Sequence, residues 1–524
     1  MADTPAPTGY DTYTSPLASR NASPEMLTIW SPRHKFNTWR RIWLAIAEAQ
    51  YEVTKDWGGS SESGPLVTKE QVEELRAVVE RGITDEELAR ASEIERDLRH
   101  DVMAHVHCLG EACPTAKPII HLGCTSQDVV CNADVFCLQE AISLILHKTT
   151  ATVIALGETG GQHRGVATLG FTHYQAAQPT TVGRRCAQWA CDLEIPNSVL
   201  GERVSMASPR GLKGATGTQA SFLNLFIDAT IVDRLEAEFL SRLSPWGYWE
   251  ACALEQLDDL NAGLVRSVSG GRHLTGQTYP RINDAVVLSN LASIAAVLHK
   301  IATDIRLLSN RKEIDEPFGK NQIGSSAMPY KRNPMKCERI CGLTRFVMNL
   351  VGNAYDTAAT QWLERTLDDS SNRRLSLPEA FLALDGALDL MHQVASGLVV
   401  NEAMVRKNLM AELPFLATEN ILMEAVKAGG DRQDLHEKIR VHAQAAGHRV
   451  KQEGLDNDLI ERLRGDPAFA PVAHLLTEDE LLDPMKYVGR SVEQTERFLA
   501  EVVEPLRERY ADELASLGGS DRGV

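Results

Sequence analysis

The stretch that decides the fold covers residues 281–316, RINDAVVLSNLASIAAVLHKIATDIRLLSNRKEIDE, and it contains neither glycine nor proline. Its large apolar residues recur at alternating steps of four and three, which is the spacing of one face of an α-helix. At 1.5 Å per residue, a single helix of this length would extend on the order of 50 Å. The apolar stripe consists of Val287, Leu291, Ile294, Leu298, Ile301, Ile305 and Leu308.

A helix of this length needs partners of similar length, because its apolar stripe must be covered. Residues 132–156 and 218–243 are likewise free of glycine and proline, and residues 335–366 have a helical pattern interrupted only by Gly342 and Gly352. Strictly alternating segments are nearly absent, so a sheet-based nucleotide-binding fold is disfavoured. The sequence therefore predicts an all-α protein with a central bundle of long helices.

A chain of 524 residues is long enough for about three domains. We expect an N-terminal helical domain over residues 1–125, a central long-helix bundle over 126–398 and a C-terminal helical domain over 399–524. Residues 1–15 are rich in Thr, Pro and Ser and are expected to form a flexible tail. The glycine-containing end at 518–523 is expected to be flexible as well.

Several local patterns add detail to this organisation. Thr84 followed by Glu87 is a capping box that predicts a helix start. Ser376 shortly before Pro378 is a second pattern typical of a helix start. The stretch 243–270 has an apolar content that indicates packing on the bundle or on a neighbouring chain.

The composition restricts the classes of partner. With 54 basic and 71 acidic residues the net charge is −17, which argues against a nucleic-acid or membrane-surface binder. No apolar run is expected to approach the roughly 20 residues that span a bilayer. The 10 cysteines include no C-x-x-C pair, which favours buried free thiols. We therefore expect a cytoplasmic protein with no membrane partner and no nucleic-acid partner.

A candidate catalytic loop covers residues 324–334, GSSAMPYKRNP. Asn333 followed by Pro334 resembles an N-cap with proline at the first helical position, so free N–H groups of the helix start would form an anion site. Two hydroxyls and two cations lie close by and provide proton-transfer candidates and positive charge. The alternative is an ordinary turn between helices. The side chains concerned are Ser325, Ser326, Lys331 and Arg332.

Histidines provide a second set of candidates. Arg99, His100 and Asp101 precede a helical segment that also carries His105 and His107, and a small polar turn with Thr125 and Ser126 follows. Zinc sites use histidines at i and i+4, which these three do not provide, so an acid/base or orienting role for His100 is favoured over a metal site. For His105 and His107 we expect packing roles.

Two further patterns are open to more than one interpretation. Thr172 and His173 lie in a polar connection over residues 168–179, where His173 is either a general acid or base or an exposed loop residue. Arginines near the candidate loop either form a solvated helix face or hold carboxylates and a phosphate in bidentate contacts. They are Arg339, Arg365, Arg373 and Arg374, with Ser370 among them.

These motifs, taken in order over roughly residues 16–510, resemble the fumarase/aspartase superfamily. Within it, the chain is similar to the adenylosuccinate lyase family of the eukaryotic type. The loop 324–334 is the feature most specific to the superfamily. The motifs that narrow the match to the family are Ser19-Arg20, Thr125-Ser126, 213–219, Gln277, 364–374, 412–415 and 417–420.

The resemblance implies a fold, an activity and an assembly. The fold is three helical domains around a long-helix bundle. The activity is elimination of fumarate from adenylosuccinate, giving AMP, and from the succinyl-aminoimidazole-carboxamide ribotide of purine biosynthesis, with no cofactor and no metal. The assembly is a homotetramer whose active sites each draw residues from three chains.

The resemblance also implies residue roles. Ser325 is the base and His173 the acid, while Lys331 and Asn333 stabilise the serine oxyanion and His100 assists. Where the family usually has tyrosine, this chain has Asn21, which puts the contacts at that end in doubt. The substrate-binding residues implied are Arg20, Asn21, Arg99, His100, Asp101, Thr125, Ser126, Thr172, Gln277, Asn333, Arg339, Arg365, Ser370 and Arg374.

Three other functions stay open. Argininosuccinate lyase and the cycloisomerases share the loop but would not need so many arginines suited to phosphate. A non-catalytic structural protein on the same scaffold would have no reason to keep Ser325, His173 and Lys331 together. A metal-dependent hydrolase would use His100, His105 and His107.

Overall fold

The computed structural model describes residues 12–57, 65–206, 208–243, 271–477 and 483–517. Two compact units divide the chain, one comprising Met1–Leu146, Pro196–Ala296 and Leu343–Ala387, the other His147–Ile195, Val297–Gly342 and Leu388–Val524. The division into three domains by sequence position stays a prediction. Most of the predicted tail at 1–15, the stretch 243–270 apart from Leu243, and the end at 518–523 lie outside the described residues.

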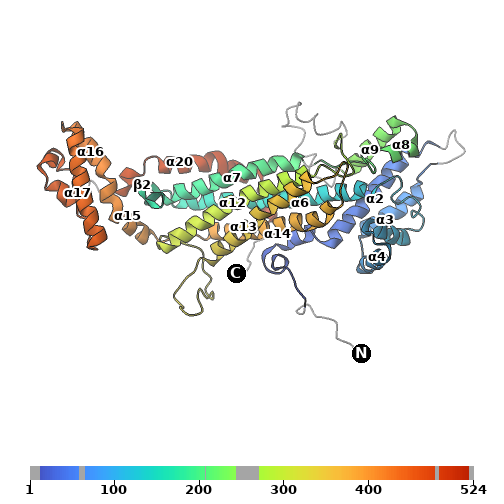
Figure 1. Cartoon of the computed structure of the whole chain (residues 1–524), viewed down its shortest axis with the longest axis horizontal. Helices are drawn as coiled ribbons and strands as arrows, with labels where there is room; N and C mark the ends of the chain where they lie inside the picture. Colours follow the sequence, from blue (N-terminus) through green and yellow to red (C-terminus); the bar gives the residue numbers. More distant parts are fainter. Residues whose placement is uncertain (1–11, 58–64, 207, 244–270, 478–482, 518–524) are drawn as a thin grey trace. The chain divides into compact units, whose positions relative to one another are not determined.

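Long helices dominate the fold, which confirms the all-α prediction (Figure 1). The predicted helix over 281–316 is α12, Ile282–Asn310. Its apolar stripe is buried from Leu291 through Leu308, and only Val287 is partly exposed. The other long helices with residues in both units are α6 (Ser126–Gln162), α7 (Val182–Met206), α13 (Met335–Ala359) and α14 (Asp368–Ser396).

Four predicted helix boundaries are wrong. The helix predicted over 281–316 ends at Asn310, and Ile314–Asp315 form the strand β3 instead. The segment 218–243 forms two helices, because Ile227 adopts a left-handed backbone (φ 65°) and the Asp228 carboxylate accepts a hydrogen bond from the Thr230 N–H at 2.8 Å, which starts a new helix. Pro378 lies inside α14 and does not open it. The predicted helix over 335–366 ends at Ala359.

Shorter helices complete the first unit. Ser31 caps α2 by accepting from the His34 N–H at 3.2 Å, and Pro32 occupies its first turn. Trp39, Ile42 and Trp43 of α2 are buried in the core of this unit, and α2 packs against α3 and α9 (Figure 1). The elements are η1 (Leu17–Asn21), α1 (Pro24–Ile29), α2 (Pro32–Thr54), α3 (Lys69–Arg81), α4 (Asp85–Leu98), α5 (Asp101–Ala112), α8 (Ala220–Phe226) and α9 (Ala229–Leu243).

The second unit contains two small antiparallel sheets, β1 with β2 and β3 with β4, and a group of C-terminal helices. The helix α15 packs against the β1–β2 hairpin, and α16 lies beside α17 (Figure 1). The elements are β1 (Ala167–Thr172), β2 (Gln175–Thr181), β3 (Ile314–Asp315), β4 (Val399–Val400), α15 (Glu402–Leu416), α16 (Thr418–Lys427), α17 (Arg432–Gln452), α18 (Leu459–Arg464), η4 (Pro467–Val472), η5 (Pro484–Tyr487), α20 (Ser491–Phe498), η6 (Leu499–Val503), α21 (Glu504–Arg509) and α22 (Ala511–Ser516).

By length and composition alone, two of the described helices, α6 and α12, could cross a membrane. The sequence-based expectation missed them because scattered polar residues interrupt their apolar runs without making the helices polar. The apolar window of α6 is 78% buried within the chain, as in the core helix of a soluble protein, but that of α12 is only 44% buried. The described residues therefore leave much of the apolar window of α12 uncovered.

Candidate active site

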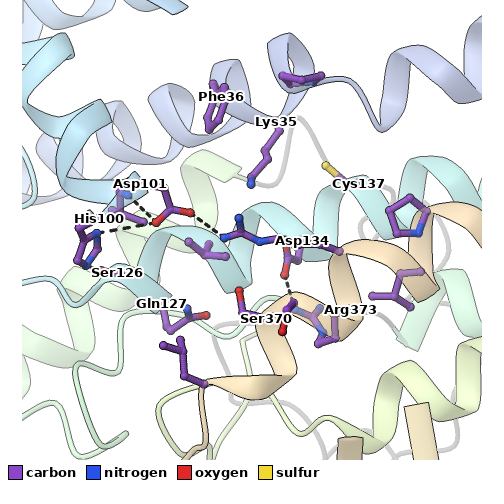
Figure 2. Close-up of a pocket in the computed structure, with 18 of the residues that line it drawn as sticks. Lys35, Phe36, His100, Asp101, Ser126, Gln127, Asp134, Cys137, Ser370 and Arg373 are labelled. Carbon is purple, nitrogen blue, oxygen red and sulfur yellow. Dashed lines mark hydrogen bonds and ion pairs between the residues drawn. The ribbon is translucent and has the colours of Figure 1, made fainter. Parts of the chain in front are cut away.

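A cavity of about 1020 Å³ lies within the first unit, where α2, the α4–α5 junction, the start of α6, residues 277–281 and the start of α14 come together (Figure 2). Six basic side chains other than histidine and three acidic ones line it. Nine residues predicted from the sequence to bind substrate are among the lining residues: Arg99, His100, Asp101, Thr125, Ser126, Gln277, Arg365, Ser370 and Arg374.

The α4–α5 junction brings three of these side chains together. Arg99 ends α4 in a left-handed conformation (φ 55°), and α5 starts only two residues later. His100 caps α5, since its Nδ1 accepts from the Met103 N–H at 3.3 Å. A neutral ring therefore carries its proton on Nε2, which lies 3.5 Å from Ser126 Oγ (Figure 2).

Asp101 is held by an arginine across the cavity. Arg374 donates a hydrogen bond to Asp101 Oδ2 at 2.7 Å (Figure 2). Burial alone would raise the pKa of Asp101, but the hydrogen bond and the charge of Arg374 outweigh it and lower that pKa. Asp101 is therefore ionised at neutral pH, and Arg374, with 57% of its side chain exposed, can still contact a ligand.

The start of α6 is fixed by a buried carboxylate that sequence reasoning missed. Asp128 Oδ2 accepts from the Thr125 N–H at 2.8 Å, and its Oδ1 accepts from Arg210 at 2.5 Å. Arg210 also donates to the carbonyl oxygens of Gly214 and Gly276, the residue before Gln277. This pair thus connects two walls of the cavity. Its only sequence signal is the carboxylate three residues after Thr125.

Other arginines of the cavity pair with carboxylates, of which Asp284 and Asp369 are buried and Asp134 is partly exposed. Arg373 donates to Asp284 at 2.6 Å and to Asp134 at 3.0 Å, and Arg281 donates to Asp369 at 2.7 Å. Arg365 donates to Gln277 Oε1 at 3.0 Å and to Asp369 at 3.3 Å. These contacts hold the cavity wall together. Among the described residues that line the cavity, Lys35 and Arg99 form no ion pair, and Arg374 pairs only with the partly exposed Asp101.

Two residues of the first unit that were predicted to bind substrate lie outside the cavity. Arg20 and Asn21 belong to η1 and are not among the residues that line the cavity. Arg20 is exposed, and the Asn21 side-chain amide donates to the carbonyl of Pro16 at 2.8 Å. The side-chain amide of Asn21 is therefore already used in a local hydrogen bond.

Thr172 and His173 belong to the second unit, where the predicted loop over 168–179 is in fact a β-hairpin. The strand pattern was missed because a register shift between Leu169 and Phe171 interrupts the alternation. His173 and Tyr174 form the turn, both with left-handed backbones (φ 53° and 56°). Both side chains are exposed.

The loop 324–334 also belongs to the second unit, and its helix start differs from the prediction. The Asn333 side chain donates to the Gly324 carbonyl at 2.8 Å and does not cap α13. Instead, the buried Glu316 carboxylate accepts from the N–H groups of Lys336 and Cys337, both at 3.0 Å. The predicted anion site is thus filled by the chain's own carboxylate, a contact that sequence reasoning missed.

Other residues of this region are placed as follows. Ser325 Oγ accepts from the Met328 N–H at 3.2 Å and is partly exposed. Lys331 is exposed, and Arg339 lies on α13.

The histidines of the metal-site alternative lie in different surroundings. His105 is 5% exposed and stacks on Phe36 with ring centroids 3.7 Å apart, which confirms its packing role. The packing role expected for His107 is wrong, because its side chain is exposed. Burial, and next the charge of Arg40, lower the pKa of His105 to about 4. In the part of the chain that the structure describes, no group of three or more His, Cys, Asp or Glu could hold a metal ion.

Comparisons with solved structures show the fold. A fumarate lyase from Mesorhizobium sp. BNC1 is similar with a TM-score of 0.74 at 21% identity, covering 92% of this chain and 99% of that one. A 3-carboxy-cis,cis-muconate lactonizing enzyme from Pseudomonas putida has a TM-score of 0.75 at 23% identity, covering 93% and 98%.

Sequence comparisons show the family. A family model described as "Lyase" matches residues 19–261 and 269–349, and one described as "Adenylosuccinate lyase C-terminus" matches residues 414–498. The adenylosuccinate lyase of Schizosaccharomyces pombe is 45% identical over 97% of this chain and 99% of its own length. That of Saccharomyces cerevisiae is 44% identical over 97% and 99%. The chain therefore belongs to the adenylosuccinate lyase family, as a lyase of the eukaryotic type within the fumarase/aspartase superfamily.

Proposed function

We propose that this chain eliminates fumarate from adenylosuccinate to give AMP, and from the succinyl-aminoimidazole-carboxamide ribotide. The observation that carries the proposal is that nine residues implied in substrate binding line one cavity of a chain that belongs to this family. A different superfamily lyase and a non-catalytic structural protein are disfavoured, since the near full-length relatives at 41–45% identity are named adenylosuccinate lyases.

The reaction needs a base and an acid. The base removes the proton from the carbon next to a carboxylate, and the acid protonates the departing nitrogen. We assign Ser325 as the base and His173 as the acid. The two left-handed residues of the His173 turn support this assignment, because backbone strain of this kind collects at functional sites.

A serine hydroxyl becomes a base only if its oxyanion is stabilised. Lys331 is the cation proposed for this role, since it lies six residues from Ser325 in the same loop and is exposed. Asn333 supports the loop through Gly324, 2.8 Å away. The start of α13 is not part of this proposal, because Glu316 occupies it.

Substrate binding is assigned to residues that line the cavity and to further residues that do not line it. Thr125, Ser126 and Gln277 would hold the succinyl group, with His100 assisting the proton transfers. The nucleotide end would contact Arg99 and Asp101, joined by Arg20 and Asn21. The further contacts proposed are Thr172, Arg339, Arg365, Ser370 and Arg374.

We further propose a homotetramer with active sites shared between chains. The incomplete burial of α12 supports it, because an apolar helix that the described part of its own chain leaves uncovered favours contact with a second copy. Ile282 and Leu307 of this helix are 49% and 40% exposed. A cytoplasmic location is supported by the nine described cysteines, all of which are free thiols.

The first experiment follows the purine ultraviolet spectrum and fumarate release from adenylosuccinate. Wild type should convert the substrate, whereas Ser325→Ala and His173→Ala should turn over orders of magnitude more slowly while still binding it. Ser326→Ala and His107→Ala are matched controls, the first being the adjacent hydroxyl in the loop and the second an exposed histidine that does not line the cavity. Wild type that leaves adenylosuccinate unchanged would refute the function.

The assembly has its own test. Light scattering should give four chains of 57.7 kDa, and mixing Ser325→Ala with His173→Ala subunits should restore activity if sites are shared. A stable, fully active monomer would contradict both statements.

A further inference from the structure

Lys35 is a cation of the cavity that no sequence motif indicates. It lies near the start of α2, is partly buried, and extends into the cavity toward Asp101 and Asp134 (Figure 2). Its Nζ lies 4.9 Å from the Trp39 ring centre and 5.3 Å from that of Phe36. Aromatic rings on the same helix therefore support the ammonium group but leave its N–H donors available.

The acids near Lys35 are already engaged by arginines. Asp101 accepts from Arg374 at 2.7 Å, and Asp134 accepts from Arg373 at 3.0 Å. Among the residues that the structure describes, none makes a hydrogen bond or ion pair with the Lys35 ammonium group. Two neutralised pairs thus flank a charge that has no counter-ion of its own.

An uncompensated charge in this position is costly to the folded protein. Burial, and next the charge of Arg374, lower the pKa of Lys35, and the nearby charges of Asp134 and Asp101 oppose this shift only in part. Protein interiors rarely keep a cation of this kind unless it is paired or has a functional role. A ligand anion would supply the missing partner and remove the cost when it binds.

We propose that Lys35 is a substrate-binding residue that pairs with an anionic group of the substrate, acting beside Arg374. The proposal rests on the proposed function for the identity of the substrate. The shared chemistry is an oxyanion, which adenylosuccinate carries at two places, the phosphate and the succinyl carboxylates. Lys35 thus completes the positive side of the cavity from α2, a helix that carries none of the predicted site residues.

The test compares Lys35→Met, Lys35→Arg and wild type in the full-length chain. Calorimetric titration with AMP reports the phosphate end, and titration with fumarate reports the carboxylate end. Lys35→Met should weaken one of the two by about tenfold to a hundredfold, the range for hydrogen bonds to charged groups, while Lys35→Arg should stay within a few-fold. Lys55→Met is the matched control, since Lys55 ends the same helix and pairs with Glu52 outside the cavity.

A second readout separates binding from packing. Without ligand, Lys35→Met should unfold at the same temperature as wild type or a higher one, because it removes a partly buried charge that has no ion-pair partner of its own. Unchanged affinity for both AMP and fumarate would overturn the proposal. The proposal would also be overturned if Lys35→Met and Lys35→Arg both unfolded at a lower temperature and lost binding equally. That result would show that Lys35 acts through packing.

The outcome is distinguishable from failure of the proposed function. If wild type binds AMP or fumarate but does not convert adenylosuccinate, the activity is refuted and the Lys35 comparison still holds. If wild type binds neither ligand, the Lys35 proposal is refuted as well.

Discussion

The carboxylate of Glu316 accepts a hydrogen bond from the backbone N–H of Lys336 at 3.0 Å, and its second oxygen accepts from Cys337 at the same distance. These contacts join the segment that precedes the loop 324–334 to the start of α13, the helix that follows it. The intervening residues 317–335 include Ser325 and Lys331, so the loop that carries the proposed base is closed at its ends by one buried acid.

Replacing Glu316 should therefore affect turnover through the position of Ser325. We expect Glu316→Gln to lower kcat by about tenfold or more with a smaller change in KM, since loss of charge-assisted bonds would cost about 1–3 kcal/mol. Steady-state kinetics and urea unfolding measure the two effects. Asp431→Asn is the control, because Asp431 caps α17 in the same way without contacting the loop. Equal losses of kcat in both variants would contradict the positioning role.

The long helices were predictable because the spacing of their apolar residues can be read directly from the sequence. The α12 stripe from Leu291 to Leu308 is buried as its spacing predicted. The interruption at Ile227 and Asp228 was not predictable from that period, because side-chain capping overrode an unbroken helical composition. Pro378 shows the opposite error, since a residue that usually opens helices is tolerated within α14.

Adjacency in the sequence made one group of site residues predictable, whereas Gln277, Arg365 and Ser370 were assigned to substrate binding by the family resemblance. Arg99, His100 and Asp101 share a junction, and local capping alone brings them together. Lys35 and Arg210 were missed because each reaches the site from a distant segment, and no local pattern distinguishes them from ordinary helix or loop residues. The contact of Glu316 with the start of α13 was also missed, because the two partners lie 20 residues apart in the sequence.

Asp128 and Arg210 form an ion pair that is completely buried. Asp128→Asn should destabilise the protein by about 3–5 kcal/mol, because it leaves the Arg210 charge uncompensated in the interior. Urea unfolding measures this loss. Asp85→Asn, which removes an exposed pair with Arg33, should cost less than about 1 kcal/mol. Similar costs for both variants would show that burial does not determine the contribution of Asp128.

The hairpin turn offers a test of stored strain. Tyr174→Gly should stabilise the hairpin by about 1 kcal/mol, because glycine adopts the left-handed backbone at φ 56° without a Cβ penalty. By contrast, Gly170→Ala should destabilise it, since an added Cβ would lie 2.4 Å from the Gln178 carbonyl oxygen. Hydrogen exchange of the β1 and β2 amides measures both changes. Slower exchange in Gly170→Ala would refute this account of the hairpin.

His105 should make stability depend on pH below neutrality. Its pKa is lowered from 6.5 to about 4 by burial, and next by the charges of Arg40 and Lys35, while Asp101 opposes the shift. The unfolded chain therefore binds a proton at a higher pH than the folded one, and the stabilisation present above pH 6.5 is lost as the pH falls toward 4. The loss should approach about 3 kcal/mol, and His105→Phe should remove it while keeping a ring against Phe36. Urea unfolding between pH 7 and pH 4 measures the slope, with His107→Gln as the exposed control. A variant slope equal to that of wild type would show that another group causes the acid sensitivity.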